Sequence, residues 1–473
     1  MTVAPAGLLA LAAESLRGAK PAVFWTDQTD APALGATVDR ALTCDLVVVG
    51  GGFTGLWAAW HAIDRDPTLD VVVLEGESVA FGASGRNGGF VSASITHGLG
   101  HGQNLWPKDI RALHAEGERN LADLIAQITA ASIDCGLSTA GKTTIAVEPW
   151  QIDDLEAAAS LATEFGENVE LQSLEQVQAD VHSPTYLAGL RSTSGNAMVD
   201  PARLAWGMAA YLRGRGVRIL EKSPVSGIAR RGARLAITVG AHEISSRQAI
   251  IATAAYKSPL LRLNWWIMPL YDHVLMTRPL SDAELTSIGW SERQGLTDAG
   301  NQFHYYRLSD DNRILWGGWD AVYYRGSRVD PALEQHGGSH ELLARNFFET
   351  FPQLADVTFT HRWAGPIDST SRFTAVYGTS HGGAVAFAAG HTGLGVGAAR
   401  FSAEVALDLL AGVPTTRTGY GIVTSKPVPI PPEPMRNPLV QFTRSRLLKA
   451  DDNEGRRGLW LRTLDHFGVG FNS

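Results

Sequence analysis

Cysteine is almost absent from this chain, which has only two, Cys44 and Cys135, among 473 residues. Two thiols cannot form a disulfide framework, so the sequence argues against a disulfide-stabilised secreted protein and favours a reducing, cytoplasmic compartment. Cys44 stands at the start of a predicted strand, where we interpret it as a small buried apolar side chain rather than a nucleophile.

Long apolar runs and excess positive charge are also lacking. No window of about 18 uninterrupted apolar residues exists, so we predict no membrane span. Residues 1–20 contain an apolar stretch without a basic region before it, which indicates a short surface helix rather than a signal peptide. The formal net charge of −8 argues against a nucleic-acid partner, because such a partner requires a basic face.

Clusters of metal ligands are missing as well. His97 and His101 are four residues apart, but Gly98 and Gly100 disfavour a helix between them. Acidic and thiol side chains, which would complete a metal site, are not nearby in the sequence. We therefore predict no bound metal.

The composition and length of the chain are those of a globular protein with two domains. Hydrophobic residues make up 45% of it and charged residues 19%, which is the balance of a globular protein. Residues 44–96 follow a strand, turn, helix and strand pattern, residues 101–189 are mostly helical, and residues 263–361 are β-prone and aromatic. A length of 473 residues suits two interleaved domains.

The strongest functional signal is a glycine-rich turn after an apolar strand, residues 45–49. Gly50, Gly52 and Gly55 follow it at the spacing G-x-G-x-x-G. In a dinucleotide fold, the first glycine allows the tight turn, the second lets the backbone approach a pyrophosphate, and the third lets the next helix lie close to the strand. The sequence therefore predicts a dinucleotide site at this turn.

The context of this motif supports the prediction. Phe53 and Thr54 begin a predicted helix, whose unpaired amides and positive end face the phosphates. A second apolar strand, residues 71–74, ends in Glu75, which we expect to accept hydrogen bonds from the ribose hydroxyls of the AMP half. A carboxylate at this position disfavours a 2′-phosphate, so NADP is not the expected ligand.

A second glycine-rich loop, residues 82–89, is not needed by a plain NAD site and indicates the longer cofactor FAD. We expect Ser84 and the neighbouring backbone amides to bind phosphate oxygens, and Arg86 and Asn87 to lie nearer the flavin ring. The residues of this loop that we assign to the cofactor are Ala83, Ser84, Arg86, Asn87 and Gly88.

Later segments of the chain support the same interpretation. Ala252 and Thr253 follow a strand where the chain of a flavoprotein returns beneath FAD, and Val225 lies on a strand that offers backbone hydrogen bonds to adenine. Residues 390–397 form a third glycine-rich turn that opens an apolar helix, whose positive end would stabilise reduced flavin. The cofactor contacts predicted there are Gly390, Thr392, Gly393, Leu394 and Gly395.

Aromatic residues are about twofold enriched between residues 265 and 324, against a chain average of 8%. Most must be sheet core, but Tyr305, Tyr306 and Arg307 are candidate walls of a pocket over the flavin. An aromatic pocket suits a cationic or neutral amine. The predicted catalytic residues are Arg86, Tyr305, Tyr306 and Arg307.

In this order, the four cofactor segments resemble the D-amino acid oxidase-like family of FAD oxidoreductases over residues 40–412. The Phe24-Trp25 pair, residues 82–89 and residues 362–365 are most similar to its gamma-glutamylputrescine oxidase branch. The resemblance implies an α/β (α+β) fold, with a Rossmann-type FAD-binding domain interleaved with an antiparallel-sheet substrate domain. We assign residues 1–100, 190–262 and 362–415 to the FAD-binding domain, 101–189 and 263–361 to the substrate domain, and 416–473 to a C-terminal extension.

The chain departs from this family where amino-acid substrates are bound. Relatives that oxidise amino acids carry an arginine soon after the Trp-Ala-Gly motif, and sarcosine oxidase carries a lysine after the late glycine loop. Here those positions hold Ile367 and Gly397, although Arg307 is a possible substitute. No cysteine lies where sarcosine oxidase attaches its flavin, so the resemblance implies non-covalently bound FAD.

We therefore predict FAD-dependent oxidation of a C–N bond in a small primary, N-substituted or polyamine-like amine. Hydride passes to the flavin, the imine hydrolyses to an aldehyde, and oxygen is the expected electron acceptor, helped by the charge of Arg86. Asp368 is a candidate partner for a distal ammonium. The alternatives are an amino-acid dehydrogenase or oxidase of the same family, a flavin-bearing subunit without turnover, and an oxidase of modified RNA, which the acidic balance disfavours.

Overall fold

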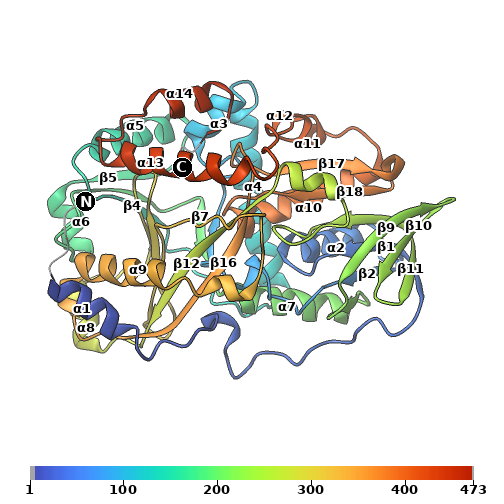
Figure 1. Ribbon diagram of the computed structural model, residues 1–473, viewed down its shortest axis with the longest axis horizontal. Coiled ribbons are helices and arrows are strands. Elements are labelled where there is room, and N and C mark those ends of the chain that lie inside the picture. Colours follow the sequence, from blue (N-terminus) through green and yellow to red (C-terminus); the bar gives the residue numbers. More distant parts are fainter. Residues whose placement is uncertain (1–5, 471–473) are drawn as a thin grey trace.

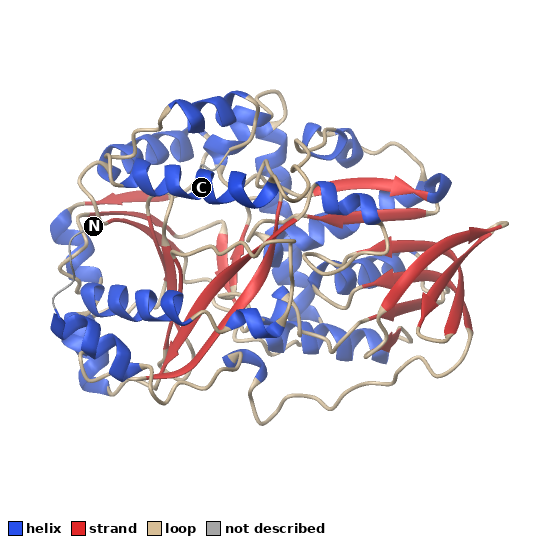
Figure 2. Ribbon diagram, viewed as in Figure 1, coloured by secondary structure: helices blue, strands red, loops and turns tan. Residues whose placement is uncertain are grey.

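Two large β-sheets lie side by side in the computed structural model, with helices packed around them (Figure 1 and Figure 2). The structure describes residues 6–470, so residues 1–5 of the predicted FAD-binding domain and residues 471–473 of the predicted extension lie outside the described residues. One sheet is mostly parallel and the other is mostly antiparallel. This arrangement confirms the predicted fold class.

The first sheet is parallel at its centre. Its middle strand β1 (Leu42–Val49) pairs in parallel with β2 (Val71–Leu74) on one side and β11 (His242–Ile251) on the other. Val47 and Val48 are fully buried, as expected of a strand that is covered on both faces. The sheet is completed by β8 (Arg218–Leu220), β18 (Val385–Ala389), β17 (Val376–Ser380) and a hairpin of β9 (Val225–Arg231) and β10 (Arg234–Val239).

Helices cover this sheet and help to fix its loops. α2 (Phe53–Arg65) packs against both α10 (Gly395–Ala411) and α7 (Pro201–Gly214). α7 begins where two start signals coincide: Pro201 occupies its first turn, and the Asp200 side chain accepts two backbone hydrogen bonds of 3.0 Å. α2 and α10 both begin at glycine-rich turns, so the two turns are brought to the same part of the molecule.

The second sheet is antiparallel except for one pair. β12 pairs with β16 along its whole length, from Met268 opposite Ser369 to Thr277 opposite Phe359, whereas β13 and β4 run parallel. The strands follow one another across the sheet as β16 (Phe359–Ser369), β12 (Met268–Thr277), β15 (Ile314–Gly318), β14 (His304–Leu308), β13 (Gly295–Asp298), β4 (Lys142–Ala146), β6 (Ala188–Ser192) and β5 (Val169–Gln172).

The remaining elements surround the two sheets. A two-stranded ladder of β3 (Phe90–Ser92) and β7 (Asn196–Met198) lies between them. The other α-helices are α1 (Ala6–Ser15), α3 (Leu99–Leu105), α4 (Ile110–Ala130), α5 (Gln151–Glu164), α6 (Leu174–Asp180), α8 (Asp282–Ile288), α9 (Gly337–Thr350), α11 (Thr416–Gly419), α12 (Gly421–Thr424), α13 (Arg436–Asp451) and α14 (Leu459–His466).

Three predicted domain boundaries need correction. α1 packs against α9 and buries Ala12 in the core under the second sheet, so residues 6–15 pack with that sheet and not with the predicted FAD-binding domain. Residues 190–192 of β6 and most of β16 were assigned to that domain as well, but both strands hydrogen-bond within the second sheet. Chain order alone does not show which sheet a strand joins, because consecutive segments here alternate between the two.

The C-terminal extension lies across the second sheet. In Figure 1 the red helices α13 and α14 lie above the strands of that sheet, and α11 and α12 lie nearer to α10. Within residues 6–470, no helix has the length and apolar character that a membrane crossing requires.

Candidate active site

A cavity of about 710 Å³ lies between the two sheets. Its wall on the first-sheet side consists of three predicted cofactor segments: the turn after β1, the loop of residues 83–88, and the turn before α10. Its opposite wall includes residues of β12, β14 and β16, with further residues from β4, β13 and β15. The structure therefore brings together segments that lie more than 300 residues apart in the chain, from Gly52 to Gly395.

The first glycine turn is packed so closely that side chains are excluded. Gly50 has a φ of +109°, and a Cβ there would lie 2.4 Å from the Ala252 carbonyl oxygen. A Cβ on Gly55 would lie 1.9 Å from the Gly50 oxygen, which confirms the close approach of helix to strand that the motif predicts. Gly52 lines the cavity and precedes the first turn of α2, whose amides have no partner within the helix.

Ser84 connects the second predicted loop to this turn. Its Oγ accepts a hydrogen bond of 2.9 Å from the Phe53 amide, and a Cβ on Gly52 would lie 2.9 Å from the same oxygen. Phe53, Thr54 and Ser84 all line the cavity. Ser84 therefore stands beside the helix start, with its hydroxyl proton still available to a ligand.

Glu75 directly follows β2 and lies beside the same turn but outside the cavity lining. One carboxylate oxygen accepts a hydrogen bond of 2.6 Å from the Gly51 amide, and the other accepts one of 2.9 Å from the Glu77 amide. Burial raises the pKa of Glu75, although both hydrogen bonds oppose that rise. Val225 opens β9 close by, since the Ser223 amide donates to the Glu75 carbonyl oxygen at 2.8 Å.

The return of the chain after β11 also lies next to the first turn. The Ala252 amide donates to the Val49 carbonyl oxygen at 2.8 Å, and Ala252 lines the cavity. Thr253 follows it, and its buried hydroxyl oxygen has no hydrogen-bond partner among residues 6–470. A bound ligand would supply a partner for this buried hydroxyl beside the glycine turn.

The loop of residues 82–89 is held rigidly by its own side chains and by two tryptophans. Asn87 donates to the Ala83 carbonyl oxygen at 2.9 Å and accepts from the Gly89 amide at 2.8 Å, so this side chain shapes the loop. The indole N–H groups of Trp25 and Trp363 donate to the carbonyl oxygens of Asn87 and Arg86, both at 2.9 Å. Trp25 and Trp363 belong to the segments that carry the sequence resemblance, and these two bonds show that they hold the backbone of the loop in place.

Arg86 lines the cavity, but its charge is already paired. The guanidinium forms an ion pair of 2.5 Å with Glu334, in the 3-10 helix Pro331–Glu334, and donates to the carbonyl oxygens of Phe81 at 2.6 Å and Ala364 at 3.2 Å. The expected role of Arg86 as a free positive charge beside the flavin therefore needs correction.

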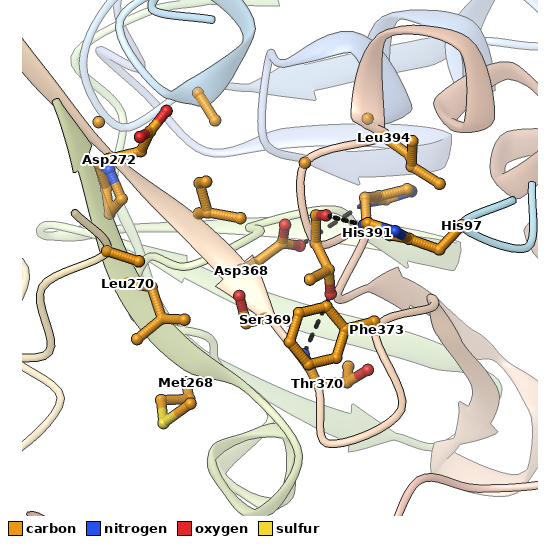
Figure 3. Close-up of a pocket in the computed structure, with 18 of the residues that line it drawn as sticks. His97, Met268, Leu270, Asp272, Asp368, Ser369, Thr370, Phe373, His391 and Leu394 are labelled. Atoms are coloured by element: carbon orange, nitrogen blue, oxygen red, sulfur yellow. Dashed lines mark hydrogen bonds and ion pairs between the residues drawn. The ribbon is translucent and has the colours of Figure 1, made fainter. Parts of the chain in front are cut away.

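The third glycine turn closes the first-sheet side of the cavity. Gly390 has a φ of +85°, and its amide donates to a carboxylate oxygen of Asp368 at 2.6 Å. The cavity is lined here by Thr392, Gly393, Leu394 and Gly395, which opens α10. Asp368 also faces His391 at 3.6 Å, as Figure 3 shows, so it has partners inside the protein and is not a free site for a distal ammonium.

The second-sheet wall presents one carboxylate that the sequence analysis missed. Asp272, Leu270 and Met268 form one column along β12 in Figure 3, because alternate residues of a strand share a face. The Tyr305 hydroxyl donates to Asp272 at 2.5 Å. Burial raises the pKa of Asp272 to about 6, with the hydrogen bond from Tyr305 opposing the rise. Asp272 could have been identified from the sequence because it stands two residues after Leu270, which places a charged side chain on the same face of the strand as an apolar one.

Two predicted pocket residues lie elsewhere. Tyr306 points away from the cavity, since neighbouring residues of a strand face opposite sides, and its hydroxyl contacts Tyr186 at 2.8 Å and Asp298 at 3.0 Å. Arg307 is buried outside the cavity lining, where it donates to the Val199 carbonyl oxygen at 2.8 Å. The prediction that Tyr306 and Arg307 wall the pocket is wrong, whereas Tyr305 does line it.

Lys142, at the start of β4, is a second charged residue that the sequence analysis missed. It lines the cavity, and burial lowers the pKa of its amine, with Glu167 opposing the change. β15, β14 and β13 separate it from the strand of Asp272. Four strand spacings correspond to about 19 Å between the two backbones. The two charged groups are therefore at different ends of the wall.

Comparison with known proteins identifies the family. Residues 45–409, more than half of the chain, match the model of the DAO family, described as FAD dependent oxidoreductase. The chain belongs to this family. It is therefore an FAD-dependent oxidoreductase.

Relatives and solved structures agree with this assignment. The chain is 29% identical over 387 residues to a probable oxidoreductase OrdL of Haemophilus influenzae, covering 78% of this chain and 83% of that protein. It is 29% identical over 383 residues to gamma-glutamylputrescine oxidoreductase of Escherichia coli, covering 80% and 85%. The fold resembles glycine oxidase from Geobacillus kaustophilus, with a TM-score of 0.68 at 17% identity over 82% of this chain and 99% of that one.

The first-sheet side of the cavity fits the FAD that this oxidoreductase family uses. Gly50 and Gly55 leave no room for a side chain, the first turn of α2 has amides without partners in the helix, and Thr253 has an unpartnered buried hydroxyl. These features could hold the pyrophosphate, with Glu75 beside the ribose and the third glycine turn beside the ring. Residues 6–470 contain no cluster of histidine, cysteine or acidic residues suited to a metal ion.

Proposed function

We propose that this oxidoreductase holds FAD non-covalently and oxidises the C–N bond of a small amine, whose nitrogen binds to Asp272. The observation that carries the proposal is the charge pattern of the cavity. Asp272 lacks a cationic partner among the described residues, whereas Arg86 and Arg444, the arginines that line the cavity, are paired with Glu334 and Asp320. The cavity thus offers a carboxylate without a cationic partner, and both of its guanidinium groups are ion-paired.

This pattern favours an amine over an α-amino acid. Desolvating an unpaired carboxylate costs several kcal/mol, so a site for amino acids needs a cationic partner close to the reacting carbon. Ile367 lines the cavity at the position where relatives supply an arginine, and Arg307 is committed to a backbone oxygen. A substrate carboxylate would instead face Asp272 and be repelled by it.

The residues of the second-sheet wall explain how the amine is prepared. Asp272 accepts the proton of the incoming ammonium, and burial favours this transfer because it raises the pKa of a carboxyl and lowers that of an ammonium. The Tyr305 hydroxyl holds the Asp272 carboxylate in place. Apolar side chains such as Leu270 and Phe303 exclude water from the neutral amine. FAD, when bound, supplies the acceptor for hydride from the carbon that bears the nitrogen.

The product leaves as an imine, which water splits into an aldehyde and an amine, and oxygen is the proposed electron acceptor. The E. coli relative, named for gamma-glutamylputrescine, supports an amine as the substrate class. The ion pair with Glu334 removes the reason for assigning Arg86 to oxygen activation.

One observation favours a second candidate, the oxidation of an amino acid. Lys142 lines the same cavity and has no ion pair within 4.0 Å among the described residues, so it is the available cation for a substrate carboxylate. Its separation from Asp272 suits a carboxylate distant from the reacting nitrogen better than an α-carboxylate. A Lys142→Met variant that loses activity only toward carboxylated amines would support this candidate.

Anaerobic bleaching of the flavin tests the proposal. The purified holoenzyme is mixed with primary amines, polyamines, N-methyl amines and amino acids, and the oxidised flavin absorbance is followed. We expect amines to bleach the flavin and oxygen to restore it with consumption of oxygen. Bleaching by amino acids alone would refute an amine substrate. Reoxidation by an artificial dye but not by oxygen would indicate a dehydrogenase, and failure of every compound would indicate a subunit without turnover.

A further inference from the structure

The C-terminal extension forms part of the cavity, although it lies beyond the matched family region, which ends at residue 409. Two stretches of it reach the cavity: the connector around Ile430 and the helices α13 and α14. The lining residues from these helices and the turn after them are Leu439, Val440, Thr443, Arg444, Leu447, Trp460, Leu464 and Val469.

This roof is apolar on its inner side. Among these lining residues only Thr443 and Arg444 have polar side chains apart from the Trp460 indole, and both make contacts within the protein. Thr443 donates to the Leu439 carbonyl oxygen at 2.9 Å and accepts from the Trp460 indole N–H at 3.1 Å. Arg444 is ion-paired with Asp320. The roof therefore offers a ligand a mostly apolar surface, and its one unpaired side-chain donor, Arg444 Nε, is itself buried.

The roof is anchored on the rim of the cavity. Asp451, in α13, accepts hydrogen bonds from the Asn301 side chain at 2.7 Å and the Gln302 amide at 3.1 Å. At the other end, Arg436 donates to the Asn264 carbonyl oxygen at 3.1 Å and to Ser327 at 2.6 Å. Both ends of α13 are thus tied to neighbouring segments, so the face of α13 that lines the cavity together with Asp272 and Tyr305 is held in place.

We propose that this roof determines substrate specificity by binding an apolar group on the amine, such as an alkyl chain or an aromatic ring. The inference rests on the proposed function, because Asp272 fixes the nitrogen and leaves the rest of the substrate to contact the roof. A distal ammonium at the roof would lose its hydration without gaining a partner, because no acidic side chain of the roof lines the cavity. Leu447 is the specificity-determining residue of the roof that offers the sharpest test.

Leu447 and Leu448 provide a matched pair. Leu447 lines the cavity, whereas Leu448 does not line it and is 38% exposed. Leu447→Asp places a carboxylate in the roof, and Leu448→Asp places the same group on the outer side of α13. Both holoenzymes must first show wild-type FAD content, which confirms that they fold.

Binding is measured with two amines that carry no hydrogen on the carbon next to nitrogen, so neither can be oxidised. tert-Octylamine has an apolar tail that tert-butylamine lacks, and their dissociation constants follow from the change in flavin absorbance. In wild type we expect tert-octylamine to bind at least about tenfold more tightly, because each buried CH₂ contributes favourably. Leu447→Asp should remove this preference, and Leu448→Asp should retain it.

Equal binding of the two amines by wild type, or equal effects of the two substitutions, would overturn the roof proposal. A neutral probe, hexanol, separates it from the amine proposal. If neither amine binds but hexanol binds in wild type and not in Leu447→Asp, the amine proposal fails and the roof proposal stands. Hexanol binding that is unchanged by Leu447→Asp would also contradict the roof proposal.

Discussion

Replacing Asp272 with asparagine should stabilise the protein while impairing its activity. Burial raises the pKa of Asp272 to about 6, whereas a solvated aspartate has a pKa of about 3.9. Between these two values the folded protein binds the proton that the unfolded chain releases, so the free energy of unfolding falls as the pH rises from about 4 to about 6. Since each pKa unit corresponds to about 1.4 kcal/mol, the ionised carboxylate destabilises the fold by about 3 kcal/mol above this range.

Asp272→Asn keeps the shape of the side chain and removes the charge. The variant should therefore gain up to about 3 kcal/mol at pH 8, and about half of that at pH 5, where the carboxyl of the folded wild type is largely protonated. The Tyr305 hydroxyl, which donates to Asp272 at 2.5 Å, retains an amide oxygen as its acceptor. The midpoint of thermal unfolding, followed by release of flavin fluorescence at both pH values, measures the gain.

The same substitution should weaken amine binding, because a charge-assisted hydrogen bond is lost. Such bonds contribute about 1.5–3 kcal/mol, which corresponds to a rise of roughly 10-fold to 100-fold in the dissociation constant of an amine. A variant that is less stable than wild type at pH 8, or one that binds amines as tightly, would refute the assignment of Asp272 as an uncompensated charge kept for function.

Further outcomes follow from the same geometry. Gly52→Val should abolish FAD retention, since a Cβ there would lie 2.9 Å from Ser84 Oγ; full flavin occupancy in the purified variant would disprove the placement of the pyrophosphate. Glu75→Ala should weaken FAD binding by roughly 1–3 kcal/mol, measured by fluorescence titration of the apoprotein. Acid precipitation should release intact FAD, whereas flavin that stays with the precipitate would indicate a covalent bond. The dissociation constant of tert-octylamine should rise as the pH falls below about 6, where Asp272 becomes neutral, and Asp272→Asn should remove this dependence.

The fold could be predicted from the sequence because its strongest signals are local. The strand, the glycine spacing at Gly50, Gly52 and Gly55, and the following helix lie within one short segment, and each glycine has a steric reason visible in the structure. The way in which the two domains interleave along the chain was harder to predict from the sequence. α1 and β16 were placed in the wrong domain, because the partner of a helix or strand is set by contacts far along the chain.

The substrate wall could be predicted only in part. Tyr305 was identified correctly as a lining residue, but strand alternation excludes its neighbour Tyr306 from the same face. Asp272 was overlooked because one acidic residue in a strand has no motif of its own. The pairing of Arg86 with Glu334 joins residues distant in sequence, and no local pattern indicates it. The same holds for the roof, whose contribution to the cavity depends on where the extension packs.

The most direct test of the central claim compares phenethylamine with phenylalanine, which differ only by the α-carboxylate. Each compound is mixed with the oxidised holoenzyme in a stopped-flow instrument without oxygen. The rate of flavin reduction is measured at equal substrate concentrations below saturation. Phenethylamine should reduce the flavin about tenfold faster or more, since about 1.4 kcal/mol in the barrier gives one decade and the carboxylate would face Asp272 without a guanidinium partner. Faster reduction by either enantiomer of phenylalanine would contradict the amine assignment and would make Lys142 the first residue to replace.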